Sequence, residues 1–368
     1  MLNSVSDTLL MGPGPSNVST AVLRAISLPT IGHLDPRFIA IMDEAKSMLR
    51  RVFATENNLT IPISGTGSAG METCFVNLIE PGDPVLVLQN GVFGTRMAEV
   101  ARRLGAEVDV VEFDWGTPVT VDRTREALAS RDYAIVAVVH AETSTGVANP
   151  VSEIAPLVRS SGALFIVDTV TSLGGMPVSV DQWEADAVYS GTQKCLSCPP
   201  GLAPLTMSER AVERLNRRTR PVPNWYLDLS LLVSYWEGAK RAYHHTAPIN
   251  MIYALHQALA DLLDEGIDSV HDRHRSQHQY LVTRLGELGL ELLVDPAARL
   301  PMLNAVVIPD GVDEASVRSS LLSDHGIEIG AGLGPLAGRI WRIGLMGHTA
   351  RKESVDRLVD ALSATLKR

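Results

Sequence analysis

The pattern of apolar and polar positions predicts alternating strands and helices over the first half of the chain. Residues 35–53 carry apolar side chains at three- and four-residue spacing, with Asp35 as the N-cap and Pro36 in the first turn, which predicts an amphipathic helix. Beyond it, short continuous apolar runs predict strands over 59–64, 85–88, 108–111, 135–140 and 164–168. Helical patterns lie between these runs, over 71–78, 93–104, 121–129 and 152–160. Strands that are apolar throughout and alternate with helices predict an α/β fold with a mostly parallel sheet covered on both faces.

The pattern changes after residue 200. A further strand is predicted over residues 202–207, and the stretch from there through Pro221 to His245 is predicted to be irregular. Two long helical patterns follow, over 249–263 and 269–288.

The remainder of the chain predicts a smaller lobe. From about Leu290 the pattern is strand, strand, helix, strand, strand, helix, and the last helix covers residues 355–366. A chain of 368 residues is also long enough for two domains. We therefore predict a large domain over 1–266, which includes the amino-terminal segment, and a small α+β domain over 267–368.

Composition and charge narrow the function classes. The chain has 42 acidic and 32 basic residues, and the basic residues are scattered, so no nucleic-acid partner is expected. Residues 1–7 lack the charged start and apolar stretch of a signal peptide, and no apolar run is as long as a membrane span. Three cysteines argue against a disulfide framework. We expect a cytoplasmic protein without a membrane partner.

Two patterns resemble metal or redox sites. Cys195 and Cys198 form a C-x-x-C, but no second cysteine pair exists to complete a zinc ribbon. His271, His274 and His278 are spaced along one helical face, where the charged residues between them favour a solvated face. We expect no metal at either place.

One lysine and one aspartate carry the most informative chemistry. Lys194 ends the small, polar run 190–194, and Asp168 ends the apolar run 164–168. Such a lysine can form a Schiff base with an aldehyde cofactor, and an aspartate at the end of a buried strand can keep a pyridine nitrogen protonated. Either residue alone could be a strand cap or a surface lysine. Together with the two features below, they predict a pyridoxal phosphate site.

A glycine-rich loop follows the first strand. Residues 65–70, Gly-Thr-Gly-Ser-Ala-Gly, open a helix, so the backbone amides and the helix dipole make an anion site. The spelling also fits the dinucleotide signature G-x-G-x-x-G, which makes an NAD-dependent dehydrogenase the rival hypothesis. That site needs an acidic residue at the end of the next strand, which here ends in Gln89 and Asn90. The loop serves the single phosphate of pyridoxal phosphate equally well.

An aromatic residue follows the second strand. Phe93 is predicted at the mouth of the sheet, where a flat cofactor ring could stack on it. An ordinary core position at the start of the next helix explains it as well.

The ordered set of motifs resembles a known family over nearly the whole chain. It is similar to the class V, fold-type I aminotransferases of the alanine–glyoxylate and serine–glyoxylate group. The segments that carry the resemblance are 11–16, 140–146, 167–168, 191–194, 243–246 and 341–344.

The resemblance implies roles around the cofactor ring. Lys194 would carry the pyridoxal 5′-phosphate, and Asp168 would contact the pyridine nitrogen. Phe93 would stack on the ring where mammalian members have tryptophan, and Thr143 would lie near the ring hydroxyl.

It also implies how the phosphate and the substrate are held. The side of the site that binds the phosphate would consist of Thr66, Gly67, Ser68 and Gln193. Tyr243 and Thr246 would join it from the neighbouring subunit of a homodimer. Arg342 would bind the substrate carboxylate with its planar guanidinium group, and Gly14 would lie at the site entrance.

One branch of the family shares further strings, over 32–36, 193–197 and 228–230. These are similar to the ureidoglycine–glyoxylate enzymes of purine breakdown. That branch has glutamine where this chain has His33 and asparagine where it has Tyr243, and the pair His33 and Tyr243 fits neither branch.

The function that the resemblance implies is amino-group transfer from a small amino acid, alanine or serine, to glyoxylate or a similar 2-oxo acid. Ureidoglycine is the alternative donor. A dehydrogenase, a non-catalytic cofactor-binding protein, and a lyase or decarboxylase on the same fold stay open as other classes.

Overall fold

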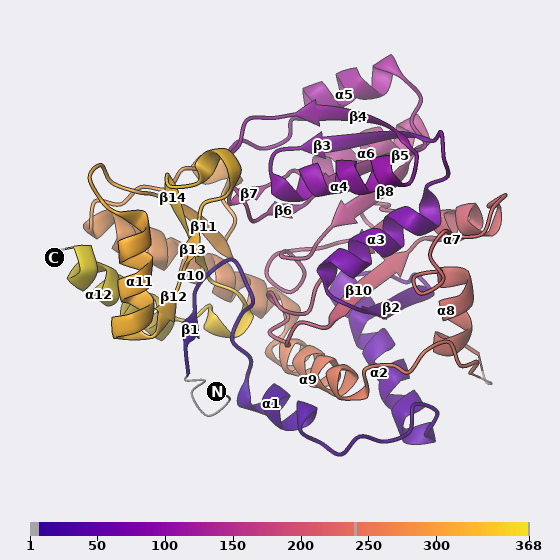
Figure 1. Cartoon of the computed structure of the whole chain (residues 1–368), viewed down its shortest axis with the longest axis horizontal. Helices are drawn as coiled ribbons and strands as arrows, with labels where there is room; N and C mark the ends of the chain where they lie inside the picture. Colours follow the sequence, from indigo (N-terminus) through magenta and orange to yellow (C-terminus); the bar gives the residue numbers. More distant parts are fainter. Residues whose placement is uncertain (1–6, 239–240, 367–368) are drawn as a thin grey trace.

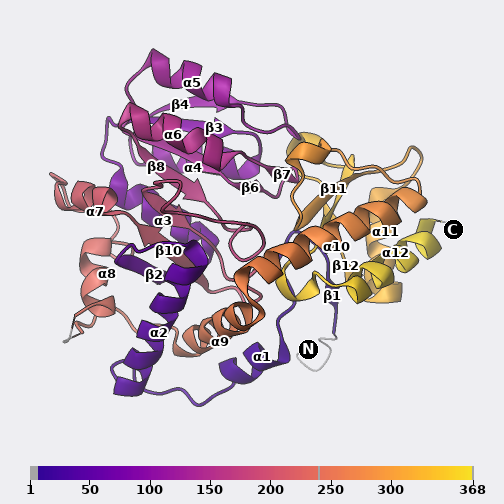
Figure 2. The same ribbon diagram turned by 180° about the vertical axis from the view of Figure 1, so that it is seen from behind.

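A computed structural model describes residues 7–238 and 241–366 (Figure 1). The amino-terminal residues 1–6, which bear on the signal-peptide prediction, lie outside the described part. A large lobe and a small lobe lie side by side, and a long helix leads from one to the other (Figure 2). Among the described residues, no helix is both long and apolar enough to cross a membrane.

The large lobe is built on a seven-stranded sheet. Its strands in order are β2 (Leu59–Ser64), β10 (Leu202–Met207), β9 (Ala187–Tyr189), β8 (Leu164–Asp168), β5 (Ile135–Val139), β3 (Pro84–Gln89) and β4 (Glu107–Glu112). Strand β10 runs antiparallel to both of its neighbours, and the other pairs are parallel. The predicted α/β fold with a mostly parallel sheet is confirmed. Because parallel strands share one carboxyl edge, the loops after β3, β5, β8 and β9 meet there.

Helices cover both faces of this sheet (Figure 1). The helices of the large lobe are α1 (Thr20–Ile26), which packs on α9 rather than on the sheet, α2 (Pro36–Phe53), α3 (Gly67–Leu78), α4 (Val92–Arg103), α5 (Val121–Ser130), α6 (Val151–Ser161), α7 (Glu209–Asn216), α8 (Leu229–Trp236) and α9 (Ile249–Glu265). The short strands β6 (Ala141–Glu142) and β7 (Val147–Ala148) form a hairpin after β5. The predicted cap of α2 is confirmed, since the Asp35 side chain accepts the Arg37 N–H at 2.9 Å.

The stretch before His245 is less irregular than predicted. It contains α7, which begins after Ser208 as N-cap, and α8, which begins after Asp228 as N-cap. Each has eight residues, too few to show a helical period in the sequence. Helix α8 is stabilised by burying Leu229, Leu232 and Tyr235 in the core.

The long helix of Figure 2, α10 (Ile267–Glu287), leads to the small lobe. Its sheet has the order β11 (Leu303–Val307), β14 (Ile340–Gly344), β13 (Gly330–Ala331), all antiparallel. The remaining elements are η2 (Pro296–Ala298), α11 (Glu314–His325), β12 (Ile327–Glu328), η3 (Gly334–Leu336), η4 (Gly347–Thr349) and α12 (Lys352–Leu366). The strand predicted just after Leu290 is absent from this described segment, where Pro296 starts a 3-10 turn instead. The predicted boundary between residues 266 and 267 stays a prediction.

The amino-terminal segment crosses to the small lobe. Strand β1 (Leu9–Leu10) pairs with β12, and the Gly344 N–H donates to the Met11 carbonyl at 2.7 Å. These contacts connect the amino-terminal segment to the small lobe immediately before residues 12–15.

The prediction of a solvated histidine face on α10 was wrong for His274. This side chain is buried, and burial lowers its pKa to about 4. Its Nδ1 lies 2.7 Å from the Val270 carbonyl, and its Nε2 accepts the Gly347 N–H at 2.9 Å. The polar residues next to His274 in the sequence suggested that it faces solvent. The face of α10 that carries His274 instead packs on the loop at η4.

Candidate active site

A cavity opens at the carboxyl edge of the large sheet. The predicted residues that line it are Thr66, Gly67, Ser68, Phe93, Thr143, Asp168, Gln193 and Lys194. The residues that the sequence reasoning missed are Met71, Arg96, Val139, Ala141, Val170 and Thr171. Loops far apart in the sequence therefore meet at one site, as expected for a parallel sheet.

Asp168 lies at the buried end of β8. Its Oδ1 accepts the Val170 N–H and its Oδ2 accepts the Tyr189 hydroxyl proton, both at 2.8 Å. Burial raises the pKa of this carboxyl to about 6, although these hydrogen bonds favour the charged form. Within the described ranges Asp168 has no ion-pair partner, so a cation brought by a ligand would find an unpaired buried carboxylate.

Lys194 lies on the loop after β9, against the amino-terminal segment. Its Nζ donates to the Pro13 carbonyl, and a Cβ on Gly14 would lie 2.5 Å from Nζ. Gly14 also has a φ of +102°, which favours glycine. Ser16 anchors the segment by donating from its hydroxyl to the Lys194 carbonyl at 2.7 Å. Gly14 therefore borders the lysine, and its place at the site entrance stays a prediction.

The environment of the Lys194 amine favours its reactive form. Burial, with a smaller contribution from the nearby Arg342, lowers the pKa of Lys194 to about 8. A lysine with this pKa is partly neutral near physiological pH and can act as a nucleophile or base.

The glycine-rich loop makes an anion site at the start of α3. Thr66 is the N-cap but makes no capping hydrogen bond with its side chain. In the described chain, neither the Gly67 N–H nor the Ser68 N–H has a hydrogen-bond partner. The buried Oε1 of Gln193 also lacks a partner. Unpaired amides at a helix N-terminus are suited to a phosphate group.

Phe93 presents its ring to the cavity from the first turn of α4. The Arg96 guanidinium lies 5.2 Å from the ring centroid, and its Nη1 donates to Ser68 Oγ at 3.4 Å. Arg96 follows Phe93 by three positions, a spacing that places both on one face of a helix. That spacing is the signal that could have identified Arg96.

Arg342, on β14, is not among the residues that line the cavity, but it contacts the backbone of Thr143, which does. Its Nε donates to the Ala331 carbonyl at 2.6 Å, and its Nη1 donates to the Thr143 carbonyl at 3.3 Å. Burial lowers the pKa of Arg342 to about 10. It forms no ion pair with any acidic residue in the described segments, so its guanidinium remains available for a carboxylate.

His33, Tyr243 and Thr246 do not line this cavity: Tyr243 and Thr246 are exposed, and His33 is half-buried. The Tyr243 side chain is 60% exposed, its ring lies 5.0 Å from the His33 ring, and its hydroxyl lies 3.4 Å from Thr246 Oγ1. His245 fastens the group to the phosphate loop, since its Nε2 lies 2.8 Å from Ser64 Oγ. The structure does not bring these three residues to the cavity of their own chain.

The two thiols of the C-x-x-C lie inside the protein. Cys195 and Cys198 are buried free thiols, and burial raises the pKa of each to about 12. Thiols with such a pKa stay protonated near neutral pH and are poor nucleophiles.

These features fit pyridoxal phosphate. Unpaired amides face one end of the cavity, an aromatic ring forms a wall, and a buried carboxyl without a cation lies beside a buried lysine. The amides could bind the cofactor's phosphate, and the aromatic ring could stack on its flat ring. The carboxyl could pair with its protonated ring nitrogen, and the lysine could react with its aldehyde.

Comparisons with known proteins agree with this chemistry. A model of the family described as aminotransferase class-V matches residues 16–358. The chain is 41% identical to the (S)-ureidoglycine–glyoxylate transaminase of Bacillus subtilis, over 98% of this chain and 90% of that protein. It is 42% identical to the alanine–glyoxylate aminotransferase of Oryctolagus cuniculus, over 98% and 92%. A crystal structure of alanine–glyoxylate aminotransferase from Nostoc sp. superposes with a TM-score of 0.97 at 51% identity, over 99% and 96%.

Proposed function

Because this chain belongs to the class V aminotransferase family, we propose that it transfers an amino group from alanine or serine to glyoxylate or a similar 2-oxo acid. It is a pyridoxal phosphate-dependent transaminase. The observation that carries the assignment of the site is the buried pair of Lys194 and Asp168 in one cavity with the unpaired amides of the glycine-rich loop.

The chemistry that pyridoxal 5′-phosphate supplies when bound is an aldehyde for the amino group and a ring that delocalises negative charge. The residues that would hold it are Thr66, Gly67, Ser68, Phe93, Thr143, Asp168 and Gln193. The Asp168 carboxylate would keep the ring nitrogen protonated, which strengthens the ring as an electron sink.

Lys194 and Arg342 would act on the substrate. The neutral Lys194 amine would take the proton from the Cα of the donor as a general base and, in the second half-reaction, would supply a proton to the Cα of the acceptor as a general acid. The Arg342 guanidinium binds the carboxylate that every donor and acceptor shares. Donor and acceptor take turns in one site, so we expect ping-pong kinetics.

The site would be completed in a homodimer. Tyr243 and Thr246 are exposed, His33 is half-buried, and none of the three lines the cavity of its own chain, which suits residues that reach a neighbouring site. An inactive Lys194→Ala chain mixed with an inactive Tyr243→Ala, Thr246→Ala chain would then form one intact site per heterodimer. Activity should return on mixing, and its absence despite proven subunit exchange would contradict shared sites.

A panel of donors tests the substrate assignment. We expect alanine or serine with glyoxylate to give a higher specificity constant than ureidoglycine, because imidazole and phenol satisfy fewer of the hydrogen bonds of a ureido group than two amides do. The similarity to the Bacillus subtilis transaminase makes ureidoglycine the competing donor. A higher specificity constant for ureidoglycine than for alanine and serine would replace the assignment.

Two variants separate general from selective binding. Arg342→Lys should weaken all donors alike, since it removes the bidentate contact to their common carboxylate. His33→Gln should change the ranking among donors.

A cytoplasmic location is also proposed, since three unpaired cysteines suit a reducing compartment, and cell fractionation would check it.

A further inference from the structure

Helix α4 has a cap that its own sequence does not supply. Its N-cap is Gly91, which has no side chain. The first N–H groups of a helix have no partner within the helix. Here Ser144 Oγ accepts the Val92 N–H at 3.0 Å, and Glu142 Oε2 accepts the Phe93 N–H at 3.2 Å, from 49 positions away in the sequence.

The Glu142 carboxylate is committed to this contact. It is completely buried, and its Oε1 accepts both the Ser144 N–H at 3.1 Å and the Ser144 hydroxyl proton at 2.6 Å. No lysine, arginine or histidine in the described part of the chain forms an ion pair with it. Burial raises the pKa of Glu142 to about 7. A negative charge at this place is favoured by the dipole of α4.

Gly91 makes room for the carboxylate. A Cβ on Gly91 would overlap the Glu142 side chain and Ser144 Oγ. Its φ of 177° is extended and open to any residue, so the glycine is needed for space. The Glu142 side chain can therefore pack against the backbone of residue 91 because that residue has no Cβ.

The contact sets the position of Phe93. The backbone N–H of Phe93 is bound to Glu142, while its ring lines the cavity and carries the Arg96 guanidinium on one face. We propose that Glu142 is a positioning residue, whose buried carboxylate holds the first turn of α4 so that the Phe93 ring lies where the cofactor ring stacks. This inference rests on the proposed cofactor site around Lys194.

Glu142→Gln tests the proposal by binding rather than by turnover. The carboxylate accepts hydrogen bonds at both oxygens, whereas the glutamine amide would place an N–H₂ group where one acceptor is needed. The first turn of α4 should therefore shift. We expect the dissociation constant of pyridoxal phosphate for the apo-protein to rise by about tenfold. The visible circular dichroism of the bound cofactor should change as well, because it reports the asymmetric surroundings of the ring.

A double-mutant cycle identifies Phe93 as the residue through which Glu142 acts. Phe93→Ala alone should also weaken cofactor binding. In the Phe93→Ala background, Glu142→Gln should add little further loss, since the ring it positions is gone. If the losses of cofactor affinity in the two single variants multiply in the double variant, Glu142 acts independently of Phe93, and the proposal is overturned.

Asp186 provides the matched control. This buried carboxyl accepts the Phe165 N–H at 2.9 Å and the Ser208 hydroxyl proton at 2.7 Å, outside the cofactor cavity. Asp186→Asn should lower the melting temperature and leave cofactor affinity and circular dichroism unchanged. A purely structural Glu142 would give the same result as Asp186, and that outcome would also overturn the proposal.

Two further measurements keep the test decisive. If Glu142→Gln does not fold, Ser144→Ala removes the Val92 half of the cap and should still weaken cofactor binding. Unchanged binding by Ser144→Ala would then count against the proposal. If wild-type protein takes up no pyridoxal phosphate at Lys194, the proposed site itself is wrong. Normal wild-type uptake with unaltered binding by Glu142→Gln would refute only the positioning role.

Discussion

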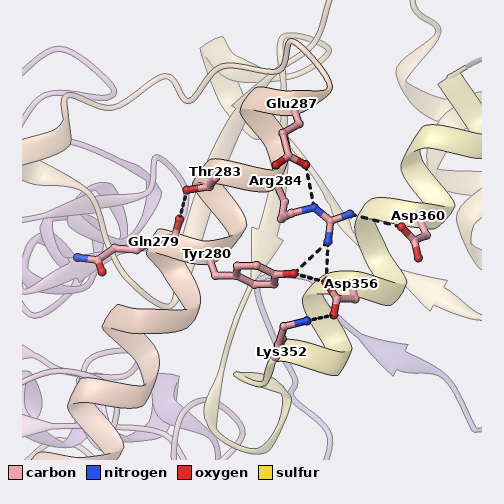
Figure 3. Close-up of polar contacts among 8 residues, drawn as sticks. All are labelled: Gln279, Tyr280, Thr283, Arg284, Glu287, Lys352, Asp356 and Asp360. Carbon is pink, nitrogen blue, oxygen red and sulfur yellow. Dashed lines mark hydrogen bonds and ion pairs between the residues drawn. The ribbon is translucent and has the colours of Figure 1, made fainter.

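Ionic side chains are arranged in opposite ways on the small lobe and in the cavity. Between α10 and α12, Arg284 contacts three acidic residues, Glu287 at 3.0 Å, Asp356 at 2.6 Å and Asp360 at 3.5 Å (Figure 3). Lys352 joins the same Asp356 at 2.6 Å. Every charge in this group has an opposite charge beside it and access to solvent.

In the cavity region, Lys194, Asp168, Arg342 and Glu142 are at most 9% exposed. None of the four forms an ion pair with another residue that the structure describes. Burying a charge without a partner is costly, and proteins keep such groups mainly where a ligand or a reaction uses them. The difference teaches that an unpaired buried charge marks the functional site better than the number of ion pairs does.

Removing Lys194 should produce the largest effect. Lys194→Ala should lower turnover on the order of 10⁴-fold, because the nucleophile and the proton carrier are lost together. Borohydride treatment of wild-type protein with bound cofactor should fix the cofactor to Lys194, as mass spectrometry of peptides would show. Lys46, a buried lysine that donates to the Trp236 carbonyl, provides the control. Lys46→Met should keep the adduct, and a reducible lysine adduct in Lys194→Ala would break the comparison.

Asp168→Asn should have the next largest effect. The amide cannot supply the negative charge that stabilises the protonated ring nitrogen, so we expect turnover to fall by on the order of 10²–10³-fold. Steady-state kinetics separate this role from substrate binding. A variant with wild-type turnover and only a higher Michaelis constant would show that Asp168 binds substrate instead.

The Lys194 pKa near 8 predicts how cofactor uptake depends on pH. The neutral amine is the reactive form, so below this pKa the rate of covalent uptake by the apo-protein should rise by about tenfold per pH unit. Above it the rate should level off. Removing the positive charge in Arg342→Met should shift the midpoint to higher pH. A wild-type midpoint near the ordinary lysine value of 10.5 would contradict the effect of burial.

Much of the fold follows from local pattern. Strand β8 has the predicted bounds because residues 164–168 are apolar up to Asp168, and a central parallel strand is buried on both faces. Asp168 and Lys194 could be paired from sequence by their chemistry, an aspartate at the end of a buried strand and a lysine at the end of a small, polar run. Strand β9 before Lys194 was not predicted, because three residues are too few to show a pattern. The short helix α8 was missed because its stability comes from tertiary packing.

The rest of the site depends on contacts between distant segments. Glu142 lies in a motif that the sequence made visible, but its role depends on the Phe93 N–H, 49 positions away. Similarly, the sequence alone could not show that Tyr243 lies beside His33 rather than beside Lys194. Polar neighbours on α10 hid the burial of His274 for the same reason.

The smallest effect should come from the paired charges of the small lobe. Arg284→Met removes the centre of the network in Figure 3 but leaves its acidic partners in contact with solvent, so no buried charge is stranded. Exposed ion pairs contribute little because water and salt screen them. We expect the melting temperature to fall by about 2 °C or less, with the difference shrinking further in high salt, and turnover to stay at the wild-type level. Thermal melts at low and high salt, together with donor kinetics, would check both parts. A loss of activity in Arg284→Met comparable to that of Asp168→Asn would show that the paired network also serves the reaction, and the contrast between the two regions would fail.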